Sequence, residues 1–275
     1  MLHFPGPRPA ALRLFLTSFC LFAVPADPAA AADAASFDET RLSPDQAPHS
    51  KWKIVVGAGG IIQPEFEGAD SYSVTPIPLV SITYGDWVEI DPEGLAATVA
   101  DVNNFAVDVL VGYELGRSED DDVRLRGLGD IDFGVSAGAR LRYEIEPFSL
   151  FAAVKKTVNG SEGLVGEFGT EVTVPLSETL IVGLAASATV ADDKYMDAYF
   201  SVTPDQSTAS GLDAYDAEAG LKSAAVSVSA IYLLDRNWFV RGEAELGMLL
   251  SDAADSPIVE RDLQPTASLF VGYRF

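Results

Sequence analysis

The sequence has few of the residues on which disulfide scaffolds and most hydrolytic sites depend. Its 275 residues include one cysteine, Cys20, and two histidines, His3 and His49. A single cysteine excludes an internal disulfide framework. Hydrolases that take up a proton near neutral pH commonly use histidine as the general base. We therefore expect no enzymatic activity, no cofactor and no metal centre, although a catalytic carboxylate pair stays open as an alternative.

Basic residues and long apolar runs are also scarce. The chain has 18 Lys and Arg against 41 Asp and Glu, for a formal charge of −23. This deficit of positive charge argues against nucleic-acid binding, which depends on cations that neutralise phosphate. No apolar run reaches the length of about 20 residues that a membrane-spanning helix needs. A hydrophobic content of 48% nevertheless makes the chain too apolar for a disordered protein.

The N-terminal residues read as an export signal. Arg8 and Arg13 precede an apolar stretch, residues 14–24, and a small-residue cleavage site follows at Ala30–Ala32. We expect residues 1–32 to be a cleaved signal peptide and residues 33–51, which are polar and lack periodicity, to be a flexible periplasmic lead-in. Residues 52–275 then form the folded domain.

In this domain apolar and polar residues alternate with a period of two. Leu141, Tyr143 and Ile145 alternate with Arg142 and Glu144. Side chains on a strand point alternately to opposite faces, so such segments are strands with one apolar and one polar side. The predicted strands are about 53–63, 75–84, 86–91, 95–100, 105–116, 130–145, 148–158, 163–175, 179–190, 217–234, 238–250 and 265–275.

Three features favour a membrane barrel over the alternative, a large soluble barrel or sandwich. Several strands are long enough for a tilted span of about 9–11 residues. Their polar faces carry charges of both signs, which a packed core would not hold unpaired. Short turns alternate with long loops, as in outer-membrane barrels. We predict an all-β, antiparallel, up-and-down transmembrane barrel of about 12 strands (roughly 10 to 14) with both termini in the periplasm.

The end of the chain supports this prediction. Tyr273 and the terminal Phe275 continue the apolar alternation of the last strand to its final residue. We interpret this pair as the C-terminal signal of an outer-membrane barrel.

The polar faces predict a charged lumen. We expect inward charges that pair across strands and each contribute little alone. If the lumen conducts, its acid excess favours cations, so a small cation-preferring pore is an alternative function. The expected network consists of Asp108, Glu114, Asp132, Arg140, Arg142, Glu144, Arg241, Glu243, Glu245 and Arg274, accompanied by Glu167 and Glu171.

The loops are acidic. We interpret residues 119–122, the pair Asp192 and Asp193, and residues 251–256 as hydrated loop faces, with cation binding or lipopolysaccharide bridging as the alternative. Pro76 and Pro78 remove backbone N–H groups from one strand edge, which predicts a strand start or a bulge there.

Several segments, in order along the chain, resemble the MipA/OmpV family of outer-membrane proteins. They are 57–78, 112–117, 195–200 and 251–259 with the closing residues 273–275. The family-like positions are Pro64, Gly68, Asp70, Tyr195, Tyr199, Asp252, Asp255, Ser256 and Pro257. The resemblance implies a barrel in the Gram-negative outer membrane, in contact with lipid and lipopolysaccharide. One family member is regarded as a scaffold between a lytic transglycosylase and a murein synthase, and others are described as antigens or adhesins. No catalytic residues are carried over.

Overall fold

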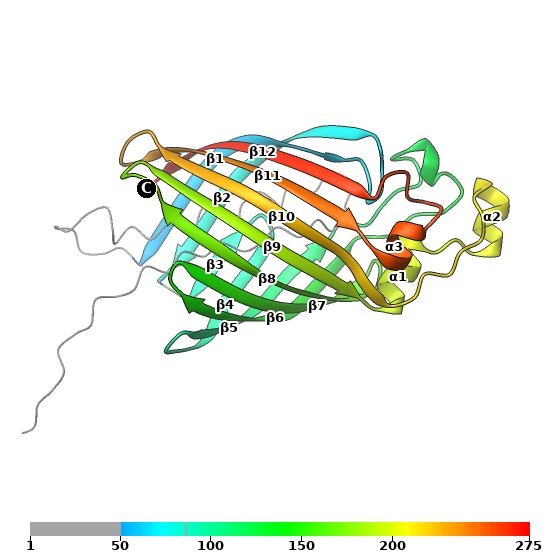
Figure 1. Cartoon of the computed structure of the whole chain (residues 1–275), viewed down its shortest axis with the longest axis horizontal. Helices are drawn as coiled ribbons and strands as arrows, with labels where there is room; N and C mark the ends of the chain where they lie inside the picture. The colour runs from blue at the N-terminus through cyan, green and yellow to red at the C-terminus, as the bar shows by residue number, and fades with distance from the viewer. Residues whose placement is uncertain (1–50, 86) are drawn as a thin grey trace, which may run out of the picture.

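The chain forms a closed β-barrel with helices gathered at one end (Figure 1). The computed structural model describes residues 51–85 and 87–275. The expected signal peptide, residues 1–32, and nearly all of the lead-in lie outside the described residues. None of the helices in the described part is long and apolar enough to cross a membrane.

The barrel has twelve strands, each antiparallel to its neighbours in sequence, and β1 pairs with β12 to close it. This confirms the predicted all-β barrel and its strand count. The strands are β1 (Trp52–Pro64), β2 (Tyr72–Tyr84), β3 (Val88–Asp91), β4 (Gly94–Val102), β5 (Phe105–Glu114), β6 (Gly134–Ile145), β7 (Phe148–Asn159), β8 (Leu164–Pro175), β9 (Leu180–Ala191), β10 (Gly220–Leu233), β11 (Trp238–Leu249) and β12 (Leu263–Arg274). The helices are η4 (Val123–Leu125), α1 (Asp193–Phe200), α2 (Pro204–Ser210) and α3 (Ser251–Asp255).

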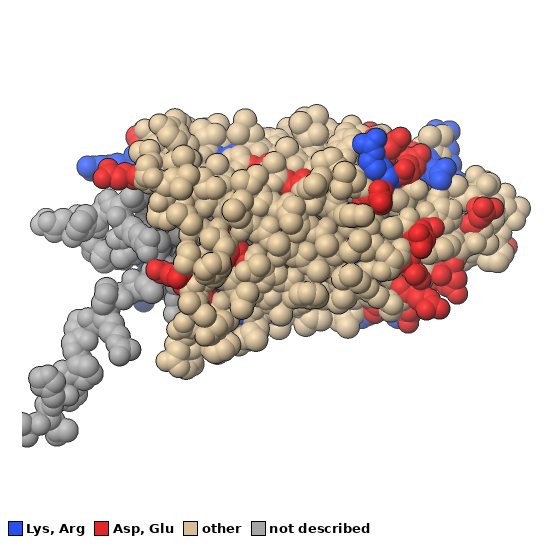
Figure 2. Space-filling view, in the orientation of Figure 1, with Lys and Arg blue, Asp and Glu red and all other residues tan. Residues whose placement is uncertain are grey.

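The outer wall is apolar. Along β6 the outward Leu141 is 46% exposed, whereas the next residue, Arg142, is only 4% exposed because it faces inward. Figure 2 shows the resulting broad uncharged belt, with charged residues concentrated towards the two ends. Aromatic rings border the belt at the short-turn end, where Trp52 packs on Tyr84 and Trp238 on Tyr273. An apolar belt edged by aromatic residues is what a barrel in a bilayer presents to lipid.

Short turns and long loops fall at opposite ends of the barrel. The C-terminus lies at the short-turn end, and α1, α2 and α3 lie at the other (Figure 1). The backbone N–H of Phe275 donates to the carbonyl of Ile54, which ties the last residue to the first strand. In an outer-membrane barrel the short turns face the periplasm. The long-loop end, here called the mouth, therefore faces outward.

The inner surface is not uniformly polar, contrary to the prediction. On one side of the barrel, apolar side chains fill the interior. Phe270 packs so closely on Gly59 that an added Cβ would lie 2.4 Å from a ring carbon. Phe239 covers Gly272 at 2.3 Å in the same way. This inner apolar cluster consists of Val55, Ile61, Ile77, Leu79, Ile231, Leu233, Phe239 and Phe270.

The wall is uneven around β3. Strand β2 pairs with β1 along its whole length of 13 residues, but β3 pairs only with Ile82, Thr83 and Tyr84. Pro76 and Pro78 lie in the middle of β2, and the β1–β2 register is continuous past them. The prediction of a strand start or bulge at these prolines was therefore wrong. Their N–H groups are dispensable because this stretch of β2 has no β3 partner.

Candidate functional site

The loops of the mouth fold together into a cap. Helix α1 begins where the Asp192 side chain accepts a hydrogen bond from the backbone N–H of Tyr195, 3.0 Å away, an N-cap contact. Tyr195, Met196, Tyr199 and Phe200 recur at helical spacing, so all four lie on one face. Each is at most 2% exposed. The sequence indicates a long loop over residues 191–216 and leaves open whether it folds inward; in the structure this segment is folded onto the mouth.

One half of the cap is held by a buried ion pair. The Lys222 ammonium, on β10, contacts the Glu67 carboxylate in the loop between β1 and β2. The other Glu67 oxygen accepts a hydrogen bond from the Tyr195 hydroxyl, 3.3 Å away. Lys222 Nζ also lies 5.3 Å from the centroid of the Tyr195 ring. A buried charge is tolerated when it is paired and hydrogen-bonded, as this one is.

The other half of the cap is held by Glu114, at the outer end of β5. Its carboxylate accepts hydrogen bonds from Thr157, Ser161 and the Tyr199 hydroxyl at 2.9–3.0 Å. Burial and the nearby Glu114 charge raise the pKa of Tyr199, so its hydroxyl stays protonated and donates. Helix α1 therefore bridges β5 on one side of the mouth to β10 on another.

A second apolar layer lies above α1. Leu125 of η4 packs with Phe66 and Ile258, which come from two other loops. The guanidinium of Arg124 donates to the Pro257 carbonyl. Burial lowers the pKa of Arg117, whose guanidinium donates to the Tyr199 carbonyl at 3.1 Å. Segments far apart in sequence are thus joined into one structure.

The loop acids hold backbone groups instead of forming only hydrated faces. Glu119 accepts hydrogen bonds from the N–H groups of Gly127 and Gly129. Asp193 and Asp252 accept from the backbone of residues 218–219. Accepting from the Glu119 N–H lowers the pKa of Asp130. Among residues 51–85 and 87–275 no group of acids, histidines and cysteines is arranged to hold a metal ion.

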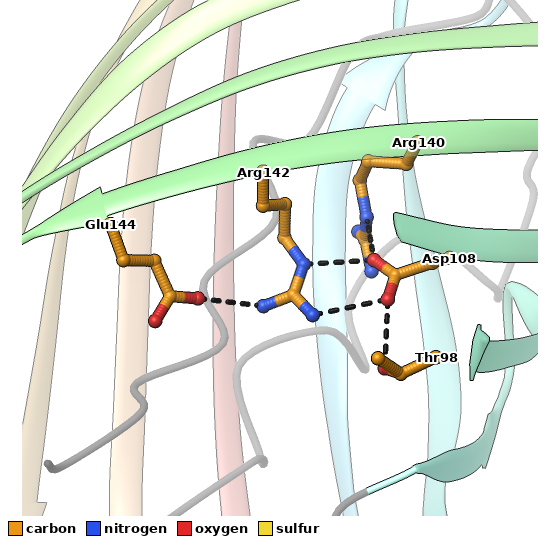
Figure 3. A network of polar contacts seen from close by, with 5 residues as sticks. All are labelled: Thr98, Asp108, Arg140, Arg142 and Glu144. Atoms are coloured by element: carbon orange, nitrogen blue, oxygen red, sulfur yellow. Dashed lines mark hydrogen bonds and ion pairs between the residues drawn. The ribbon is translucent and has the colours of Figure 1, made fainter. Parts of the chain in front are cut away.

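Below the mouth, Asp108 organises part of the predicted lumen network (Figure 3). Its carboxylate accepts from Arg140 Nε at 2.9 Å and from two nitrogens of Arg142 at 2.8 and 3.1 Å. Thr98 donates to the same carboxylate at 2.8 Å, and Arg142 also donates to Glu144 at 2.8 Å. Asp108 is directly opposite Arg140 in the β5–β6 register, so strand pairing alone brings them together.

The other predicted lumen residues are spread out. Arg241 donates to Glu243 at 2.5 Å, and both oxygens of the buried Glu245 have no hydrogen-bond partner in the described part of the chain. Arg274 donates to the Arg236 carbonyl at the short-turn end. Asp132 is exposed in the loop before β6 and does not join the network, because that strand begins at Gly134, later than predicted.

The cap was not predicted from the sequence, and its key residues Lys222 and Glu67 were missed. Alternation along β10 would have placed Lys222 on the outward face with Val226 and Val228, and the register shift between Leu221 and Ser223 turns it inward. Nothing local signals that Glu67 would be its partner, because the two residues are 155 positions apart.

The family-like segments meet in the cap. The N–H of Gly68 donates to the Gln264 side chain, and the Ser256 hydroxyl donates to the Phe200 carbonyl. Two of the family-like positions, Tyr195 and Tyr199, belong to α1, and Asp252 and Asp255 belong to α3. The Pro257 carbonyl accepts a hydrogen bond from Arg124. Pro64 is the last residue of β1, and Asp70 lies in the loop that follows it. The resemblance therefore rests largely on residues that build the mouth.

Solved outer-membrane barrels resemble the chain at low identity. The NanC porin is 7% identical, with a TM-score of 0.40, covering 81% of this chain and 98% of that chain. OmpT of Vibrio cholerae is 8% identical, with a TM-score of 0.36, and the match covers 82% of this chain and 98% of OmpT. OprD of Pseudomonas aeruginosa is 11% identical, with a TM-score of 0.37, and the match covers 80% of this chain and 65% of OprD. No curated protein matches the chain.

The family comparison is broader than the segments on which the resemblance was based. The family described as "MltA-interacting protein MipA" matches residues 56–275, which include nearly the whole barrel and every loop of the cap. The chain is a member of the MipA family.

Proposed function

We propose that this chain is a non-enzymatic outer-membrane anchor that holds a murein-hydrolysing enzyme at its periplasmic end, and through it a murein synthase. The cap is the observation that supports this proposal. Lys222, Glu67 and Glu114 fix α1 across the mouth with buried bonds, so we assign the partner to the short-turn end. The family's description as MltA-interacting agrees with a protein partner.

The short-turn end has a distinct charge. Asp101, Glu146, Glu178 and Asp235 are exposed acids in or beside four of its turns. Asp235 is engaged in its own turn, where it accepts from the N–H groups of Asn237 and Trp238. These four acids lie at one end of the barrel, beside the exposed Lys51 and Arg236. Their excess suits a basic patch on a partner, and complementary charge chiefly sets specificity and association rate.

We expect the triple variant Asp101→Asn, Glu146→Gln, Glu178→Gln to lower the recovery of a cell-wall lytic enzyme several-fold after crosslinking in envelopes. The matched control is Asp205→Asn, Asp213→Asn, Glu260→Gln, which makes the same charge change on exposed residues of the mouth. Recovery is measured by mass spectrometry after purification in mild detergent. Crosslinking that captures no cell-wall enzyme, or equal losses in both triples, would contradict the proposal.

A small cation-preferring pore is the second candidate. Both carboxylate oxygens of Glu245 lie in the lumen without a hydrogen-bond partner among the described residues, so a carboxylate is available there to attract cations. We expect the intact chain to give no discrete conductance steps in a planar bilayer, since α1 spans the mouth. Replacing residues 193–218 by a short Gly-Ser linker should open cation-selective steps. Steps from the intact chain would favour the pore over the anchor.

A further inference from the structure

One carboxylate inside the lumen is deeply buried. Glu245, on the inward face of β11, is 5% exposed, and both of its carboxylate oxygens lack a hydrogen-bond partner in the described part of the chain. The charged side chains that act on it electrostatically, Glu243 and Glu167, are acids as well. Buried charges in proteins are normally paired or coordinate a metal ion. A cation beside Glu245 would therefore stabilise this part of the lumen.

A small space lies next to this carboxylate. Gly247 is the next inward residue of β11 and its φ is not in the left-handed region, so the backbone there does not require glycine. A methyl group added to Gly247 would lie 4.0 Å from Glu245 Oε1 and 3.4 Å from the Gln264 carbonyl oxygen, both normal contact distances. The glycine thus leaves open a space the size of a methyl group, with an oxygen atom on two sides.

The two neighbouring strands add hydroxyl oxygens. Ser227 of β10 and Thr266 of β12 are each directly opposite Glu245 in the strand registers. Side chains that are directly opposite lie on the same face of the sheet, with their Cβ atoms about 5 Å apart. Carboxylate, carbonyl and hydroxyl oxygens from three adjacent strands therefore meet around this space. Oxygen ligands of this kind suit hard cations.

We propose that the space over Gly247 is a Ca²⁺ site in which the Glu245 carboxylate is the one charged ligand. The Gln264 carbonyl, the two opposite hydroxyls and lumen water complete the coordination. This ligand set draws on a single acid. It is therefore compatible with the finding that no cluster of acids, histidines and cysteines in residues 51–85 and 87–275 is arranged to hold a metal.

The chemistry of the site favours Ca²⁺ over other common cations. Ca²⁺ accepts about six to eight oxygen ligands in a flexible geometry, whereas Mg²⁺ demands near-ideal octahedral coordination and gives up water reluctantly. The charges of Glu243 and Glu167 favour a divalent ion over a monovalent one, since the attraction grows with ionic charge. The ion joins β10, β11 and β12 below the cap. It lies apart from the short-turn end to which we assign the partner, so the two proposals can fail independently.

Calcium binding to a charge variant and a steric variant tests the site. Glu245→Gln removes the charge and keeps the size of the side chain. Gly247→Ala fills the space with a methyl group and leaves every carboxylate in place. The matched control, Asp213→Asn, removes one exposed acid at the mouth. The full chain is folded in maltoside micelles, stripped with a chelator and dialysed to equilibrium against radioactive Ca²⁺, with or without Mg²⁺.

We expect the intact chain to bind one Ca²⁺ ion that an equal concentration of Mg²⁺ does not displace. Glu245→Gln and Gly247→Ala should each lower the affinity roughly tenfold or more, whereas Asp213→Asn should leave it nearly unchanged, because exposed distant charges are screened. Heat-modifiable mobility on gels verifies folding, and Thr266→Val, which removes one ligand, should weaken binding several-fold if either variant does not fold. No saturable binding by the intact chain, displacement by Mg²⁺, or unchanged affinity in a folded site variant would overturn the proposal.

Discussion

Replacing Lys222 by alanine is expected to weaken the cap by about 3–5 kcal/mol, the usual cost of removing one partner of a buried ion pair. The Lys222 side chain is fully buried, and the Glu67 carboxylate that it contacts is 4% exposed. Without Lys222, this carboxylate keeps the Tyr195 hydroxyl as its hydrogen-bond partner in the described part of the chain and loses the cation that compensates its burial. The measurement is the rate of trypsin cleavage after Lys194 in α1, which reports local opening of the cap.

The matched control is Glu162→Gln. Glu162 pairs with Lys194 at 2.8 Å, but both side chains are more than half exposed. Exposed pairs contribute about 0–1 kcal/mol, so cleavage should hardly change. The double variant Lys222→Met, Glu67→Gln removes both charges and should recover much of the loss. Unchanged cleavage in Lys222→Ala would show that the ion pair does not hold the cap.

Replacing Asp108 by asparagine is expected to lower the free energy of unfolding of the barrel by about 3–5 kcal/mol. Asp108 is 1% exposed and is the shared acceptor for two guanidinium groups. The amide keeps the size of the side chain but removes the negative charge that Arg140 and Arg142 share, while the Glu144 contact to Arg142 stays. Urea unfolding in lipid vesicles, followed by tryptophan fluorescence, measures the change.

Glu144→Gln separates this effect from a general response to charge removal. Glu144 makes one contact to Arg142, at 2.8 Å, and its side chain is 24% exposed. We expect a loss of about 1 kcal/mol or less, because partial exposure lets water replace the contact. Equal losses in the two variants would mean that Asp108 has no special role in the lumen.

Period-two alternation was sufficient to predict the barrel because each strand has one face towards lipid. Even the short strands β3 and β4 were located within a few residues. Alternation also placed Asp108 and Arg140 on inward faces, and antiparallel pairing then made them neighbours. These are properties of single strands and of adjacent strands, which a linear sequence carries directly.

The cap and the inner apolar cluster depend on contacts between distant segments. Residues 193–200 have the spacing of an amphipathic helix, but with eight residues the signal is hidden in a loop rich in turn formers. Phe239 and Phe270 are apolar at positions where the alternation predicts polar, inward residues. In the structure each ring packs on a glycine of a neighbouring strand. Pro76 and Pro78 make sense only when the length of β3 is known.

The bonds of the cap also constrain the order in which the molecule can be assembled. Glu67 reaches Lys222 across 155 positions, and Gly68 reaches Gln264 across 196. Contacts at such separation carry a large loop-closure cost and form late. Gln264 lies near the start of β12, the strand that seals against β1, so the complete cap must wait until the chain ends have met. We therefore expect the mouth to be loose during insertion, so that each polar loop can pass the bilayer separately before the cap closes.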